Sequence, residues 1–136
     1  MNILSIPLWL DIVNFGLVVL IWLVQLIIYP AFAYINEDEF ANWHRGYVKT
    51  ISSIASPLML AQMVLILWLV FTQPGLPDFL MLSGIIIIWI SSFSLSVPCH
   101  KKLTQIGKNQ SVITRLVRTN WIRTILWTAV FLTGIA

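Results

Sequence analysis

Long apolar runs are the feature that most limits what this chain can fold into. Four stretches of about 20 residues are almost entirely apolar, and a helix of that length crosses the ~30 Å hydrocarbon core of a bilayer. They cover approximately residues 8–29, 51–72, 79–97 and 118–135. Only α-helices satisfy every backbone group inside lipid when the apolar residues are continuous rather than alternating. The sequence therefore predicts an all-α, polytopic membrane protein.

Composition excludes a water-soluble protein. Apolar residues make up 59% of the 136 residues and charged residues only 10%, with a mean hydropathy of +0.90. Soluble domains carry about 25% charged residues, so a chain this short and apolar cannot cover itself with polar surface in water. We expect a single transmembrane domain over residues 1–136. The one cysteine, Cys99, excludes a disulfide and any metal site that needs two cysteines.

The connections between the spans differ in length and polarity. Residues 73–78 form a short turn with two prolines and a glycine, and Asp78 is placed to cap the helix that follows. Asn36 and the three acidic residues after it predict a helix that starts near Glu37 and continues into the second span. Ser111 is placed to cap the fourth helix. We therefore expect a membrane four-helix bundle whose second helix extends well beyond the lipid.

Basic residues lie on one side of this predicted bundle. Of the eight, Arg45 and Lys49 lie between the first and second spans. The other six lie between the third and fourth spans or at the start of the fourth, and they are Lys101, Lys102, Lys108, Arg115, Arg118 and Arg123. The positive-inside rule places both long connections and the extended second helix in the cytoplasm, with N-out/C-out termini in the plasma (inner) membrane. The basic charge is thus an orientation signal that faces anionic lipid rather than nucleic acid.

Polar side chains at membrane depth form the candidate binding site. Such residues are costly in hydrocarbon and mark functional positions by default, although they also serve as helix-packing contacts. Counting residues along each helix places a polar layer in the cytoplasmic half of the bundle. The predicted ligand-binding residues are Gln25, Tyr29, Ser96, Asn120 and Trp127. Both interpretations of this layer, ligand site and packing contact, remain open at this stage.

Arg123 and the two histidines carry the candidate chemistry. No acidic residue lies at the depth of Arg123, so its guanidinium reaches the cytoplasmic boundary, bonds to carbonyls and hydroxyls, or holds an anionic ligand group. His44 and His100 lie near the cytoplasmic mouth and can act as general bases or proton shuttles. We predict catalytic roles for His44, His100 and Arg123, with an ordinary interfacial role for each histidine as the alternative.

A metal or haem shared by the two histidines is not expected. His44 lies about 28 residues from the proline turn and His100 about 21, which is a depth difference of ~10 Å in straight helices. A shared site would need Pro57 to bend the second helix strongly. No acidic residue pairs with either histidine at a recognised metal-binding spacing. We therefore predict no metal site, and the sequence identifies no cofactor.

Several local patterns resemble a group of small four-span bacterial membrane proteins of unknown function. They are NWIRTILWT at 120–128, VPCHKKL at 97–103, YPAF at 29–32 and FANWH at 40–44. The group implies a four-helix membrane bundle and no established activity. More distantly, the chain is similar to anthrone-oxygenase-like membrane proteins, which would imply oxidation of an aromatic polyketide. The positions that match the pattern are His44, Pro98, His100, Asn120, Trp121, Arg123 and Thr124.

Two classes of function fit these features. In the first, the protein binds or converts a small amphiphilic substrate: Asn120 and Arg123 hold an anionic or carbonyl oxygen, and a histidine moves protons. In the second, it is a non-catalytic accessory subunit that docks into a larger membrane complex. A transporter is less favoured because no inverted repeat is apparent. The expected partners are the lipid bilayer and either a small amphiphile or other membrane subunits, and a homo-oligomer is compatible with the sequence.

Overall fold

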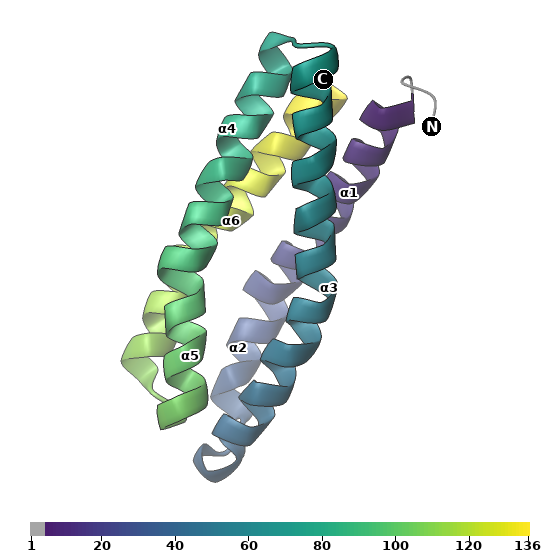
Figure 1. The fold of residues 1–136 in the computed structure, drawn as a ribbon. Coiled ribbons are helices and arrows are strands. Elements are labelled where there is room, and N and C mark those ends of the chain that lie inside the picture. Colours follow the sequence, from purple (N-terminus) through teal and green to yellow (C-terminus); the bar gives the residue numbers. More distant parts are fainter. Residues whose placement is uncertain (1–4) are drawn as a thin grey trace.

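The computed structural model describes residues 5–136, and in this part of the chain the fold is built from helices without strands. The helices join end to end into four long rods, which run alternately up and down a bundle (Figure 1). The first rod contains α1 (Ile6–Leu23), η2 (Val24–Ile28), α2 (Tyr29–Ala31) and η3 (Phe32–Tyr34). The second is α3 (Glu37–Thr72), the third contains α4 (Leu76–Ser91), η4 (Ser92–Ser96) and α5 (Val97–Ile106), and the fourth is α6 (Gln110–Ile135). The predicted all-helical class is confirmed.

Two of the rods continue through a proline. The predicted first span of residues 8–29 ends just before Pro30, but the first rod continues through this proline, and the third rod likewise continues past Pro98. In both rods a five-residue π-helical turn, η2 or η4, ends two residues before the proline. A proline ring displaces the carbonyl four residues earlier, which here lies inside the wider π turn that accommodates it. The residues that follow each proline therefore stay in the bundle.

The helix starts agree with the predicted turn chemistry in two places and differ in one. α3 begins at Glu37, as predicted. In the turn before α4, the backbone N–H of Gly75 donates to Oδ2 of Asp78 at 2.9 Å. Ser111 does not cap α6, because Asn109 precedes the helix and accepts a hydrogen bond from a first-turn backbone N–H at 3.1 Å.

Three of the rods are long and apolar enough to cross a membrane, namely Ile6–Tyr34, Glu37–Thr72 and Leu76–Ile106. The 36 residues of α3 span about 54 Å, which exceeds a ~30 Å hydrocarbon core by roughly 24 Å. These features are those of a membrane protein. α6 is not among the three, since Asn120 and Arg123 interrupt its apolar sequence, and the fourth span stays a prediction.

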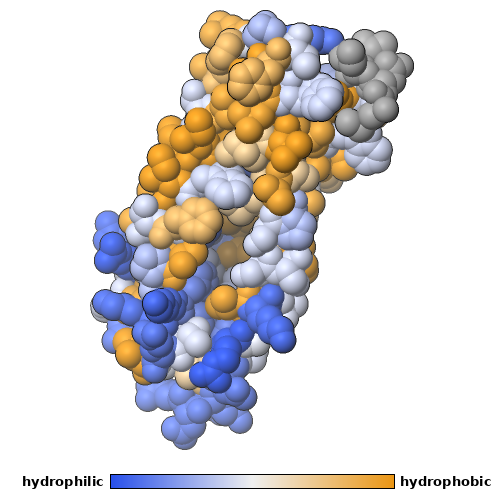
Figure 2. All heavy atoms as spheres, in the orientation of Figure 1, coloured by the Kyte–Doolittle hydropathy of each residue, from blue (hydrophilic) through white to orange (hydrophobic). Residues whose placement is uncertain are grey.

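The bundle has one apolar and one polar end. The start of α1, the end of α6 and the α3–α4 turn lie together, and the other two connections lie at the opposite end (Figure 1). Figure 2 shows hydrophilic residues gathered at the end with those two connections and apolar side chains over the other half. There Nζ of Lys108 donates to the carbonyls of Ala33 and Ile35 at 3.0 and 2.8 Å, which joins the two connections.

Buried side chains form two clusters along the bundle. The apolar-end cluster contains Leu17, Ile66 and Ile85, each 0% exposed. The polar-end cluster is rich in aromatic rings and includes Phe32 and Phe40, both also 0% exposed.

Gly84 lets α4 pack closely against α6. A Cβ atom at this position would lie 2.9 Å from Cγ2 of Val130. We expect Gly84→Ala to lower the midpoint of thermal unfolding in detergent, with the cost of about 1–3 kcal/mol that overpacking typically carries. Gly16→Ala is the matched control, because a Cβ there meets nothing within 4 Å and alanine favours a helix by ~1 kcal/mol. An unchanged midpoint for Gly84→Ala would contradict the close approach.

Candidate functional site

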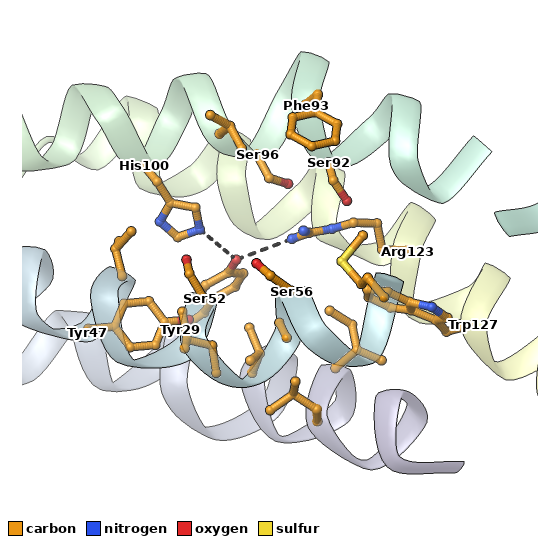
Figure 3. A pocket seen from close by; sticks show the side chains of 18 residues that line it. Tyr29, Tyr47, Ser52, Ser56, Ser92, Phe93, Ser96, His100, Arg123 and Trp127 are labelled. Atoms are coloured by element: carbon orange, nitrogen blue, oxygen red, sulfur yellow. Dashed lines mark hydrogen bonds between the residues drawn. The ribbon is translucent and has the colours of Figure 1, made fainter. Parts of the chain in front are cut away.

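A chain of hydrogen bonds joins four of the predicted site residues. Nε2 of His44 and Nδ1 of His100 are 3.0 Å apart, and Nδ1 of His44 is 3.0 Å from Oγ1 of Thr104. On the other side of His100, Nε2 lies 3.3 Å from the hydroxyl of Tyr29. That hydroxyl also accepts from the Arg123 guanidinium at 3.5 Å, and Figure 3 shows it between Arg123 and His100. We call these five residues the polar chain.

The closeness of the two histidines corrects the depth argument from the sequence. Their rings stack with centroids 5.2 Å apart and 23° between the planes. α4 begins at Leu76 rather than near Phe79, so His100 lies further from the turn than expected. Figure 1 also shows that α3 bends near its middle, where Pro57 lies. The early helix start and the bend together bring the two rings to the same depth.

Aromatic rings enclose His44. Its imidazole stacks on Phe40 with centroids 5.5 Å apart and 14° between planes, and the ring of Phe32 lies nearly perpendicular to it with centroids 5.6 Å apart. His44 is 0% exposed. Over residues 5–136, no three His, Cys, Asp or Glu side chains come together where a metal ion could be held. The histidine pair is therefore hydrogen-bonded to Thr104 and Tyr29 rather than grouped with acidic or thiol ligands.

Arg123 lies at the end of the polar chain without an acidic partner in the described part of the protein. Its hydrogen bonds go to Oδ1 of Asn120 and to the Tyr29 hydroxyl. Its Nε is buried and has no partner. Because a guanidinium carries five N–H donors and no acceptor, Arg123 retains donors that a negatively charged or carbonyl oxygen can use.

Asn120 and Gln25 hold the helices together behind Arg123. Nδ2 of Asn120 donates to Oε1 of Gln25 at 2.7 Å, and Nε2 of Gln25 donates to the carbonyl of Val117 at 3.4 Å. Both residues are buried. Their amides are bonded within the protein, and Asn120 also accepts a hydrogen bond from the Arg123 guanidinium.

A cavity of about 180 Å³ lies beside Tyr29, His100 and Arg123. The rest of its wall is mostly apolar and comes from all four rods: Leu20, Ile21, Val24, Tyr47, Val48, Ile51, Ser52, Ala55, Ser56, Met59, Ser92, Phe93, Ser96, Val97 and Trp127. Ser52 and Phe93, on opposite walls, are both exposed, so the cavity opens sideways between α3 and η4 (Figure 3). It is somewhat larger than the ~150 Å³ of an engineered cavity that holds benzene.

A second buried amide cluster fixes one wall of the cavity. Nε2 of Gln62 donates to Oδ1 of Asn14 at 2.7 Å, and Nε1 of Trp127 donates to Oε1 of Gln62 at 3.2 Å. Asn14 and Gln62 are each 0% exposed. The indole of Trp127 is thereby held in one orientation between this cluster and the cavity.

The structure divides the predicted site residues into two sets. Those that line the cavity are Tyr29, Ser96, His100, Arg123 and Trp127. Those that do not line it are Gln25, His44 and Asn120. His44 bonds to His100 and Asn120 to Arg123, whereas Gln25 bonds to Asn120 and not to the lining residues.

Residues outside the predicted set also contribute. Tyr47 and Ser52 line the cavity, and Thr104 ends the polar chain. The available signal for Thr104 is its position four residues after His100, on the same helical face. Tyr47 lies three residues after His44 and so shares its helical face, but its contact with the cavity depends on how α3 packs.

Comparison of this chain with protein-family models, with curated proteins and with solved structures finds no match. The relation to anthrone-oxygenase-like proteins thus stays an expectation from the sequence patterns.

Proposed function

We propose that the protein takes up a small amphiphile from the lipid and holds the oxygen of its polar end against Arg123. The observation that carries this proposal is the sideways-opening cavity, whose inner wall presents a guanidinium with no carboxylate bonded to it. A charge of this kind is costly at membrane depth unless it has a partner or a function. An anionic or carbonyl oxygen supplied by a ligand would complete its hydrogen bonding.

Cavity size and shape support one ring or a short chain as the part that enters. About 180 Å³ accommodates a group of roughly benzene size, and a longer tail would leave through the mouth between α3 and η4. The exposed phenyl ring of Phe93 at that mouth is apolar, as a lipid-facing entrance requires. A ring-sized compartment is also compatible with the aromatic substrate that the resemblance implies.

The position of the cavity along the bundle supports an amphiphile rather than a wholly apolar lipid. Its α3 wall runs from Tyr47 to Met59, which overlaps the cytoplasmic end of the predicted span 51–72. In this proposal the polar head lies at the membrane boundary and the tail in hydrocarbon. The polar end of the bundle faces the cytoplasm, and the membrane is the plasma (inner) membrane.

Acid–base chemistry is the conversion that the site supports best. The Tyr29 hydroxyl and Nε2 of His100 lie next to the guanidinium, within hydrogen-bond distance of each other. A bound head group at Arg123 would therefore have a proton acceptor or donor beside it. The residues that we assign to this chemistry are Tyr29, His100 and Arg123.

An accessory subunit is the second candidate. The observation that favours it is that the Asn120–Gln25 and Gln62–Asn14 pairs each join two rods through buried amides. Such bonds serve helix association in membranes without any ligand. Direct ligand binding separates the two candidates.

The binding test uses 2-hexyl-4-nitrophenol, a chromogenic amphiphile with one ionisable oxygen, and its methyl ether as the matched neutral probe. Equilibrium dialysis of the protein in lipid nanodiscs, with empty nanodiscs as the blank, should show saturable binding of the phenol and weaker binding of the ether. Ala55→Phe, which fills the cavity wall, should abolish saturable binding. Ala129→Phe, the same change at an exposed site on α6, should retain it.

Two results would contradict the proposal. One is binding no greater than that of empty nanodiscs, which would leave the accessory-subunit candidate. The other is wild-type binding by Ala55→Phe, provided that its thermal unfolding shows a folded protein, since the probe would then bind elsewhere.

A further inference from the structure

We propose that Tyr29, His100, His44 and Thr104 form a proton relay between the cavity and the polar end of the bundle. The inference rests on the proposed function, because the relay needs an occupant in the cavity. It adds that this occupant is a weak acid, such as a phenol, an enol or a carboxylic acid. The relay exchanges the occupant's proton without opening the cavity to bulk water.

We assign the direction of each hydrogen bond in the relay from the donor inventory and from two neutral imidazoles. Arg123 only donates, so the Tyr29 oxygen accepts from it and the Tyr29 O–H is free to donate to Nε2 of His100. Nδ1 of His100 then carries the proton and donates to Nε2 of His44. Nδ1 of His44 in turn donates to Oγ1 of Thr104. One arrangement with two neutral imidazoles thus satisfies the whole chain.

Two residues of the relay are buried, while His100 between them is partly exposed and lines the cavity. Tyr29 is 2% exposed and His44 is 0% exposed, and the rings of Phe32 and Phe40 cover His44. Thr104 at the far end is only partly buried. It lies on α5 in the polar half of the bundle that Figure 2 shows as hydrophilic. A proton that leaves the cavity along this path reaches water at Thr104.

The completed transfer moves one proton from the occupant to water and leaves every protein group of the relay neutral, with both imidazoles in the other tautomer. As the occupant's O–H proton passes to the Tyr29 oxygen, the Tyr29 proton passes to Nε2 of His100. The Nδ1 proton of His100 passes to Nε2 of His44, and the Nδ1 proton of His44 passes to Thr104. The hydroxyl proton of Thr104 goes to water. The occupant remains as an anion, which the positive charge of Arg123 stabilises.

Other ionisable groups near the relay come from three rods. Tyr47 on α3 has its ring centroid 6.1 Å from that of His100 and 6.0 Å from that of His44. Arg123 on α6 approaches from the cavity side, and buried Cys99 on α5 neighbours His100 in sequence. None of these groups replaces a hydrogen bond of the relay.

The direction of the hydrogen bonds is tested on the protein without a bound probe, by ¹⁵N NMR of the histidine-labelled full-length chain in detergent. We expect both imidazoles to carry their proton on Nδ1, and we expect a scalar coupling across the hydrogen bond between Nδ1 of His100 and Nε2 of His44. Tyr29→Phe removes only the hydroxyl and should release His100 from this tautomer. Protons on Nε2 of both rings in the wild type, or no response to Tyr29→Phe, would overturn the proposed direction.

Proton transfer itself is tested with bound 2-hexyl-4-nitrophenol, whose colour reports its ionisation. After a pH jump in a stopped-flow instrument, Thr104→Val should slow ionisation of the bound probe about tenfold or more, because a general acid–base group has been removed from the path. Thr50→Val, at an exposed position on α3, should leave the rate unchanged. His44→Phe is a second relay variant and should slow the rate as Thr104→Val does.

The outcomes separate this inference from the proposed function. Dialysis that shows no probe binding overturns the proposed function, and with it the need for a relay. Normal binding with wild-type ionisation rates in both Thr104→Val and His44→Phe overturns the relay alone. Normal binding with slow ionisation in both variants supports it.

Discussion

Arg123→Gln is expected to weaken binding of the ionised nitrophenol about 10- to 100-fold, because hydrogen bonds to a charged group are worth about 1.5–3 kcal/mol. Glutamine keeps a polar side chain of similar reach but removes the positive charge. Binding of the methyl ether should change little, since the ether carries no charge for Arg123 to neutralise. The measurement is equilibrium dialysis of both probes in nanodiscs.

Arg118→Gln is the matched control for this prediction. Arg118 lies on the same helix and carries the same charge, but it is exposed and does not line the cavity. It should bind both probes as the wild type does. If Arg118→Gln weakened binding as much as Arg123→Gln, attraction to the basic surface rather than the cavity would explain the affinity. Equal affinity of Arg123→Gln and wild type for the ionised probe would remove the basis of the proposed site.

Asn120→Leu is expected to cause the largest loss of stability among the substitutions considered. Asn120 is 0% exposed, bonds to Gln25 and accepts from Arg123. Leucine has a similar volume but leaves both partners without that bond, and each unsatisfied buried group costs about 1–3 kcal/mol. The expected sum is about 2–4 kcal/mol, since partners available in the unfolded membrane state offset part of the cost. Thermal unfolding in detergent measures it.

Asn42→Leu is the control, because Asn42 is exposed on the α3 extension. It should unfold near the wild-type midpoint. A similar midpoint for Asn120→Leu and wild type would contradict the structural role of the Asn120–Gln25 pair. Its probe binding is informative as well: a folded Asn120→Leu protein should bind more weakly, since Arg123 loses the group that positions it.

Together the two substitutions distinguish a ligand site from helix-packing contacts. Arg123 lines the cavity and Asn120 lies behind it. The amphiphile proposal therefore expects Arg123→Gln to act mainly on binding and Asn120→Leu mainly on stability. In the accessory-subunit candidate, both changes would act on stability alone.

The helical class and the approximate positions of the apolar spans follow from the sequence by itself. Hydropathy and backbone satisfaction in lipid depend on runs of residues, not on how those runs pack. Thus the apolar stretches, the start of α3 at Glu37 and the absence of an acid near Arg123 could all be predicted. The same argument from runs of residues predicts that Tyr29 and His100 lie near the cytoplasmic boundary of the membrane.

Only the tertiary structure decided which polar residues meet. The π turns before Pro30 and Pro98 each alter the helical phase, and one residue more in a turn rotates everything beyond it by about 100°. The bend of α3 and the early start of α4 then set the depth of each ring. The contact between His44 and His100 depends on all of these. Counting residues along straight helices therefore places the two rings at different depths, although they are hydrogen-bonded in the structure. The cavity has the same origin, since a space between four rods depends on their rotation and tilt.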